Sequence, residues 1–187
     1  MRGGGKYNIP VDKRFEFYSL WEAACVHFTS KTFICIVYRT PKCDLQPFYL
    51  DCDLRFAEKT AMPQSQYLLL GSRMCEFISK KYNHPRVEFL LVQKKNGYWK
   101  KIEGTDRWCV GAHFYFGALR FSREDAVDIR NATLHFCGEA FGEFKLVNDY
   151  EDVLDRRVCI QRCNGLFLPG CYKHGSSHAG PYVGTAL

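Results

Sequence analysis

The sequence has no apolar run long enough to cross a membrane. Its longest apolar stretches, residues 33–38 and 67–70, fall far short of the roughly 20 residues that a bilayer helix needs. The first residues also lack the charged start and apolar middle of a secretory signal. We therefore expect the chain in a reducing compartment, cytoplasmic or nuclear, and not at a membrane. The ten cysteines would then act as thiols, metal ligands or nucleophiles, because disulfides are rare in such compartments.

Three common signatures of nucleotide and metal enzymes are also missing from the sequence as we interpret it. We find no glycine-rich phosphate loop, no dinucleotide-binding fingerprint and no pair of metal-binding carboxylates. These absences favour a protein that binds a partner over one that catalyses a reaction. The formal net charge of +6 is modest, so it permits a polyanionic partner without requiring one.

Length and composition predict one globular domain that is rich in strands. The 187 residues are enough for one core, and the aromatic share of 16% favours strands and large packing units. We predict an α+β fold, mainly an antiparallel β-sheet or a partly open barrel, with two or three short helices. Residues 1–10 are expected to be a flexible N-terminus, residues 11–158 the domain, and residues 159–187 a Cys- and His-containing loop tail.

Hydrophobic periodicity predicts where the elements lie. Apolar and polar residues alternate over residues 48–56, which is typical of a strand with one solvent-facing side. Asn96-Gly97 separates two strand-like runs and predicts a hairpin of residues 87–93 and 98–102. Ser65 and Ser122 are predicted to cap helices. The other predicted elements are a strand over 32–38, helices over 18–28, 122–130 and 150–157, a hairpin or one long bulged strand over 108–121, and strands over 133–137 and 141–147.

A basic and aromatic strip in the predicted hairpin is a candidate nucleic-acid site. Positive charge neutralises phosphates, and aromatic faces stack on unpaired bases. The strip therefore predicts contact with RNA or with an acidic protein partner. A solvent-exposed hairpin, in which lysines prevent pairing with other strands, would have the same composition. In such a strand the side chains alternate between the two faces, so either Tyr98 or Trp99 would point towards the core. The candidate residues are Lys94, Lys95, Tyr98, Trp99, Lys100 and Lys101.

The C-terminal tail carries the most concentrated set of soft metal ligands. Four such donors can hold a tetrahedral zinc ion, and a loop with few apolar residues would gain order from the metal. The spacing matches no standard zinc finger. In the alternative interpretation the cysteines pack on the domain and the histidines are solvated. The predicted zinc ligands are Cys159, Cys163, Cys171 and His174.

Two classes of hydrolase remain as alternatives. His27-Phe28-Thr29 fits one element of the two-histidine phosphoesterases, but the possible second copies at His113 and His135 lack Ser or Thr at their third position. A cysteine protease would need a cysteine and a histidine in contact, and the sequence selects no pair. The candidates are Cys25, Cys109 or Cys171 with His113, His135 or His174.

Our leading interpretation is a small intracellular, non-enzymatic regulatory protein. Its composition resembles that of viral leader or accessory proteins, although no sequence motif is shared with them. It would bind RNA or host proteins through the basic hairpin and hold a structural zinc ion in its tail. The alternatives are a hydrolase and a protein–protein adaptor with an exposed aromatic face.

Overall fold

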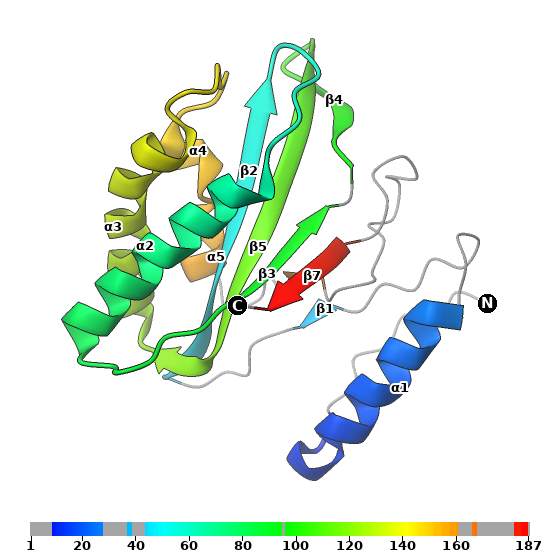
Figure 1. Cartoon of the computed structure of the whole chain (residues 1–187), viewed down its shortest axis with the longest axis vertical. Coiled ribbons are helices and arrows are strands. Elements are labelled where there is room, and N and C mark those ends of the chain that lie inside the picture. Colours follow the sequence, from blue (N-terminus) through cyan, green and yellow to red (C-terminus); the bar gives the residue numbers. More distant parts are fainter. Residues whose placement is uncertain are drawn as a thin grey trace. The chain divides into compact units, whose positions relative to one another are not determined.

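An open five-stranded antiparallel sheet organises most of the chain (Figure 1). The computed structural model describes residues 9–27, 37–38, 44–94, 96–160, 166–167 and 182–186. The predicted α+β fold with a mainly antiparallel sheet is confirmed, and the sheet does not close into a barrel. The strand order is β2 (Gln46–Phe56), β5 (Thr105–Phe121), β3 (Leu90–Lys94) and β7 (Tyr182–Ala186), and β4 (Tyr98–Ile102) pairs with β5.

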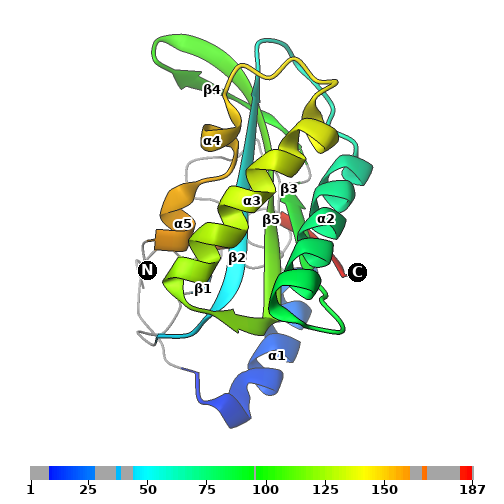
Figure 2. The same ribbon diagram turned by 90° about the vertical axis from the view of Figure 1, so that its left-hand side faces the viewer.

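Two long helices, α2 (Gln64–Tyr82) and α3 (Arg123–Phe141), lie side by side on one face of this sheet (Figures 1 and 2). We call this side the helix face. The apolar residues of β2 alternate into it, and Leu50, Cys52 and Leu54 are fully buried there. They pack in one core cluster with residues of both helices, among them Leu70 and Ile129. The alternating pattern of residues 48–56 thus corresponds to a half-covered strand, as predicted.

The remaining described elements are short. A 3-10 turn (Val11–Lys13) and α1 (Arg14–His27) lie in one compact unit, Met1–Ile34, and everything else lies in a second unit, Cys35–Leu187. The second unit also contains α4 (Tyr150–Val153), α5 (Arg156–Ile160) and a two-stranded pair, β1 (Val37–Tyr38) with β6 (Leu166–Phe167). Among the described helices, none has the length and apolar character of a membrane span.

The predicted hairpin around Asn96-Gly97 is wrong. Strand β3 pairs with β5 and β7, whereas β4 turns back on β5 through the two-residue loop Glu103-Gly104. Both loop residues have positive φ angles, 50° and 83°, as a tight turn between right-handed twisted strands requires. Glutamate seldom adopts this conformation, so the residue at position 103 did not indicate a turn. Gly97 instead allows the Trp108 ring to pack closely on the backbone, because a Cβ atom at position 97 would lie 2.5 Å from that ring.

The two strands predicted over 133–137 and 141–147 are also wrong, because α3 continues to Phe141. Ser122 caps this helix as predicted, since its hydroxyl accepts a hydrogen bond from the Asp125 amide. The buried residues Ile129, Thr133 and Cys137 recur at a spacing of four and face the sheet. Burial of this stripe overrides the β-propensity of the Thr-Leu-His-Phe segment.

Several other predictions can be compared with the structure. Residues 105–121 form one long strand, the second of the two alternatives considered for residues 108–121. Helix α2 begins at Gln64 without a side-chain cap, so Ser65 is not its cap. Residues 150–157 hold parts of two short helices, and residues 182–186 of the predicted loop tail add strand β7 to the sheet. Of the predicted strand over 32–38, only Val37 and Tyr38 lie within the described residues.

Candidate active site

Two aspartates of β2 lie on the face of the sheet opposite the helices. Asp51 and Asp53 alternate along β2 with residues buried on the helix face, so both side chains point to the other side. The Asp51 side chain is 21% exposed, and Asp53 is half-buried. Residues two apart on a strand share one face, which brings the two carboxylates into one small region.

Strand β5 supplies a histidine and a glycine opposite these aspartates. The register places His113 across from Asp51, and the His113 Nε2 atom lies 3.3 Å from the Asp51 Oδ1 atom. Gly111 lies across from Asp53. A Cβ atom at position 111 would approach the Asp53 Oδ1 atom to 2.9 Å and the Cys52 carbonyl oxygen to 2.6 Å. Glycine therefore gives the Asp53 carboxylate room to lie over β5.

Lys94 at the end of β3 adds a positive charge to this face. Val92 pairs with His113, so Lys94, two residues further on, points to the same side. Its Nζ atom lies 3.2 Å from the Tyr98 hydroxyl and 4.3 Å from the centroid of that ring. Burial lowers the pKa of the Lys94 ammonium group, and the nearby Asp53 and Asp51 carboxylates partly oppose this effect. Asp51, Asp53, His113 and Lys94 are called the carboxylate cluster below.

The backbone of the aspartate strand is fixed along its free edge. The Asp51 carbonyl accepts a hydrogen bond of 3.2 Å from the Asp155 amide. The side chain of Asn148 acts like a short neighbouring strand, because it donates to the Asp53 carbonyl at 2.9 Å and accepts from the Arg55 amide at 3.0 Å. An edge strand paired in this way holds its side chains in a defined orientation.

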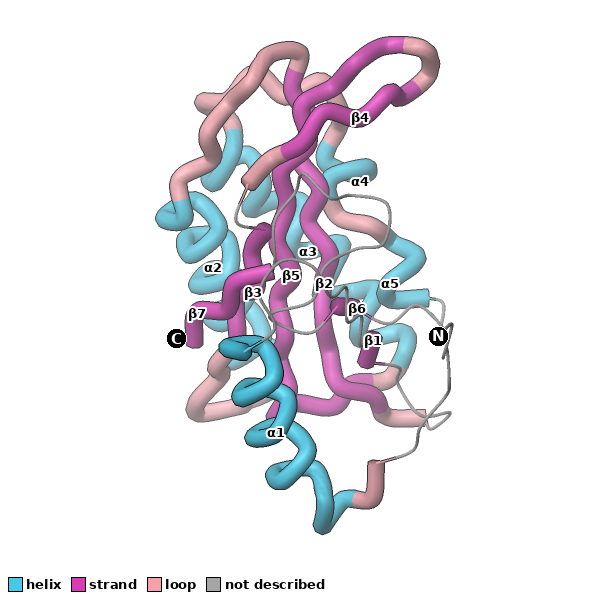
Figure 3. Tube along the Cα trace, turned by 90° about the vertical axis from the view of Figure 1, so that its right-hand side faces the viewer, coloured by secondary structure: helices cyan, strands magenta, loops and turns pink. Residues whose placement is uncertain are grey.

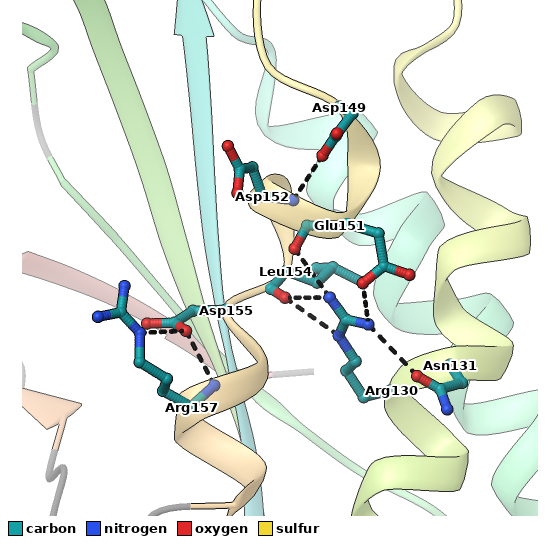
Figure 4. Close-up of polar contacts among 8 residues, drawn as sticks. All are labelled: Arg130, Asn131, Asp149, Glu151, Asp152, Leu154, Asp155 and Arg157. Carbon is teal, nitrogen blue, oxygen red and sulfur yellow. Dashed lines mark hydrogen bonds and ion pairs between the residues drawn. The ribbon is translucent and has the colours of Figure 1, made fainter. Parts of the chain in front are cut away.

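Arg130 of α3 anchors the segment that covers this edge (Figure 4). Its guanidinium group is 1% exposed and donates to the Leu154 carbonyl at 2.7 Å and to the Glu151 carbonyl at 2.8 Å. It also forms an ion pair of 2.6 Å with the Glu151 carboxylate. Leu154 in turn pairs with Cys52, which lies between the two aspartates. A buried arginine thus connects the helix layer to the strand that carries the cluster.

The structure divides the predicted basic strip between two faces. Tyr98 and Lys100 lie opposite Cys109 and Arg107, on the face of the carboxylate cluster. Trp99 and Lys101 alternate to the helix face, where the Trp99 ring packs edge-to-face on Trp108 at 5.5 Å. The six predicted residues therefore do not form one surface. Lys95 lies outside the described residues.

Only one of the four predicted zinc ligands can be placed. Cys159 is half-buried beside the core, and burial raises the pKa of its thiol to about 12. Cys163, Cys171 and His174 lie outside the described residues. Within the described ranges, no group of three or more His, Cys, Asp or Glu residues is arranged to hold a metal ion by itself.

Within the second unit, the structure does not bring the hydrolase candidates Cys109, His113 and His135 together. His113 lies on the cluster face, whereas His135 is exposed on α3 over the helix face. Cys109 and His113 are four residues apart on β5, which separates them by about 13 Å. Burial also raises the pKa of the Cys109 thiol, which disfavours the nucleophilic thiolate. His27 ends α1, and its partner Thr29 lies outside the described residues, as does Cys171.

The prediction from sequence missed the carboxylate pair although its signal was present. The segment Asp51-Cys52-Asp53 lies in the clearest period-two stretch of the chain, and that period alone puts both carboxylates on one face. The structure thus shows a carboxylate pair where the sequence analysis noted none. His113 gave no local signal, because its place beside Asp51 depends on the pairing of two strands about 60 residues apart in the sequence.

A comparison with protein families gives one match. The family described as the C962R protein N-terminal AEP domain matches residues 1–186. The C962R protein is viral, and an AEP domain is a primase-like enzymatic domain. No curated protein matches the chain.

Proposed function

The chain belongs to the family of C962R N-terminal AEP domains, and from that premise we propose that it joins nucleotides in a primase-like reaction at the carboxylate cluster. One observation carries the proposal. Asp51 and Asp53 share one face of β2, and the imidazole of His113 lies 3.3 Å from the Asp51 carboxylate. An enzymatic role replaces the non-enzymatic regulatory protein that the sequence favoured.

The two carboxylates suit a divalent cation such as magnesium. This ion prefers oxygen ligands, and nucleotide-using enzymes usually hold it through one or two carboxylates together with substrate phosphates and water. When bound, it neutralises phosphate charge and activates an attacking hydroxyl group. Gly111 fits this role, because any side chain there would collide with the Asp53 carboxylate and the Cys52 carbonyl.

The other members of the cluster have roles that follow from their positions. His113 is buried and holds the Asp51 carboxylate in place through its Nε2 atom. Lys94 supplies a positive charge for binding the phosphates of a nucleoside triphosphate. The ring of Tyr98 limits the movement of the Lys94 ammonium group. Bound phosphates would oppose the lowering of the Lys94 pKa by burial.

The test is nucleotide incorporation by the purified chain on a single-stranded template with magnesium or manganese. We expect Asp51→Asn and Asp53→Asn each to lower the rate by about 10²- to 10³-fold, because metal ligation contributes several kcal/mol to such reactions. Binding of manganese, followed by electron paramagnetic resonance, should weaken in the same two variants. Both substitutions keep side-chain size, so the melting temperature should change little.

Asp106→Asn is the matched control. Asp106 is an exposed aspartate on β5, opposite Lys101 and on the helix face. Its loss should leave the incorporation rate and manganese binding unchanged. Wild-type activity that survives in both Asp51→Asn and Asp53→Asn would refute the proposal, as would equal losses in all three variants.

A further inference from the structure

Three cations lie on the same face of the sheet as the carboxylate cluster, beyond its Asp53 end. Arg55 follows Asp53 along β2, and Arg107 precedes Cys109 and Gly111 along β5 at intervals of two residues. Lys100 lies directly opposite Arg107 in the β4–β5 hairpin. With Lys94 of the carboxylate cluster, they form what we call the cationic strip, which consists of Arg55, Lys94, Lys100 and Arg107.

The Cys109 thiol lies among the charges of this strip. Cys109 lies opposite both Arg55 and Tyr98, in the middle of the strip. Burial and the nearby Asp53 carboxylate raise the pKa of this thiol, and the positive charges of Lys100, Arg55 and Lys94 each lower it in part. Three cations from three different strands therefore act on one sulfur atom. Arg55 also contacts the carboxylate of Asp152 at 3.4 Å, and that carboxylate is 63% exposed.

The strip runs along the strands and ends at the cluster. Arg107 and His113 are six residues apart on β5, which corresponds to about 20 Å. Figure 3 looks onto this face and shows the β4–β5 hairpin extending past the rest of the sheet. The opposite face of the hairpin is different in character: Trp99 and Lys101 lie there with Asp106 and Trp108. A linear row of positive charges that leads to a nucleotide site fits an extended polyanion.

We propose that the cationic strip binds the phosphate backbone of a single-stranded nucleic acid and leads that strand to the carboxylate cluster. The proposal rests on the proposed function and names the macromolecular partner of the same site. It also changes the original hypothesis about the hairpin, because Lys100 acts with Arg55 and Arg107, whereas Trp99 and Lys101 belong to the other face. Phosphate contact implies that DNA and RNA strands are both ligands.

The experiment measures binding without metal or nucleotide, so that it is independent of catalysis. Fluorescein-labelled oligothymidine and oligouridine of about 16 nucleotides serve as probes, and fluorescence anisotropy is recorded over a range of salt concentrations. The double variant Lys100→Gln/Arg107→Gln should bind roughly 10- to 30-fold more weakly at low salt. The slope of log K against log salt should become shallower by about 0.7 for each phosphate that the variant no longer neutralises.

Lys101→Gln is the matched control, since it removes the same charge from the next residue on the opposite face. It should bind like the wild type. The single variant Lys100→Gln, at an exposed position, repeats the test without altering the half-buried Arg107. Three outcomes overturn the proposal: no binding of either probe by the wild type, equal losses in the Lys100 and Lys101 variants, or a loss only in Lys101→Gln or Trp99→Ala. Any of these can occur while Asp51 and Asp53 remain essential for nucleotide incorporation, so the two proposals fail separately.

Discussion

The substitution Arg130→Met, which removes the guanidinium group, should lower the free energy of unfolding by about 2–4 kcal/mol. Methionine keeps most of the buried aliphatic volume but removes every donor. The Leu154 and Glu151 carbonyls then lose their bonds of 2.7 and 2.8 Å. The buried Leu154 carbonyl costs about 1–3 kcal/mol when it is left without a donor, and the part-buried Glu151 carbonyl adds about 1 kcal/mol. Relief from burying the guanidinium charge offsets part of this sum.

The control for this prediction is Glu151→Gln. The Glu151 carboxylate is 65% exposed, so its ion pair with Arg130 should contribute less than about 1 kcal/mol. Urea unfolding, followed by circular dichroism, measures both variants, and an unchanged m-value would show that the transition midpoint reports stability alone. A loss below about 1 kcal/mol in Arg130→Met would refute the reasoning. Equal losses in both variants would show that the ion pair, and not the carbonyl bonds, holds the segment.

Three further predictions concern thiols, Gly111 and zinc. Burial raises the pKa of the Cys137 and Cys159 thiols from 9.0 to about 12. Between those values the unfolded chain binds fewer protons, so the free energy of unfolding should fall by about 1.4 kcal/mol per pH unit for each thiol, as pH-dependent urea melts can measure. Gly111→Ala should cost about 1–3 kcal/mol and lower nucleotide incorporation, because its Cβ atom would meet the Cys52 carbonyl and the Asp53 carboxylate; thermal melting with the incorporation assay checks this. The zinc hypothesis expects about one zinc ion per chain by elemental analysis and a lower melting temperature after chelation. A metal-free protein with an unchanged melting temperature would reject the site formed by Cys159, Cys163, Cys171 and His174.

The patterns that the sequence revealed correctly are those that depend on neighbouring residues. The alternation over residues 48–56 indicated β2, because a strand covered on one side must place apolar side chains at every second position. The same period already put Asp51 and Asp53 on one face. The serine before α3 indicated its start, because an N-cap is satisfied by amides within three residues. Helix and strand segments of this kind are determined locally.

The site itself was decided by tertiary structure. His113 and Lys94 lie near the aspartates because β5 pairs with β2 in one register and with β3 in another, and no local pattern encodes those registers. Burial against the sheet turned a β-prone segment into the second half of α3. The turn at Glu103-Gly104 directed β4 to β5 instead of β3, and so placed Lys100 beside Arg107. Sequence alone determined which residues alternate, but long-range strand pairing determined which charges meet, because hydrogen bonds between distant strands set the register.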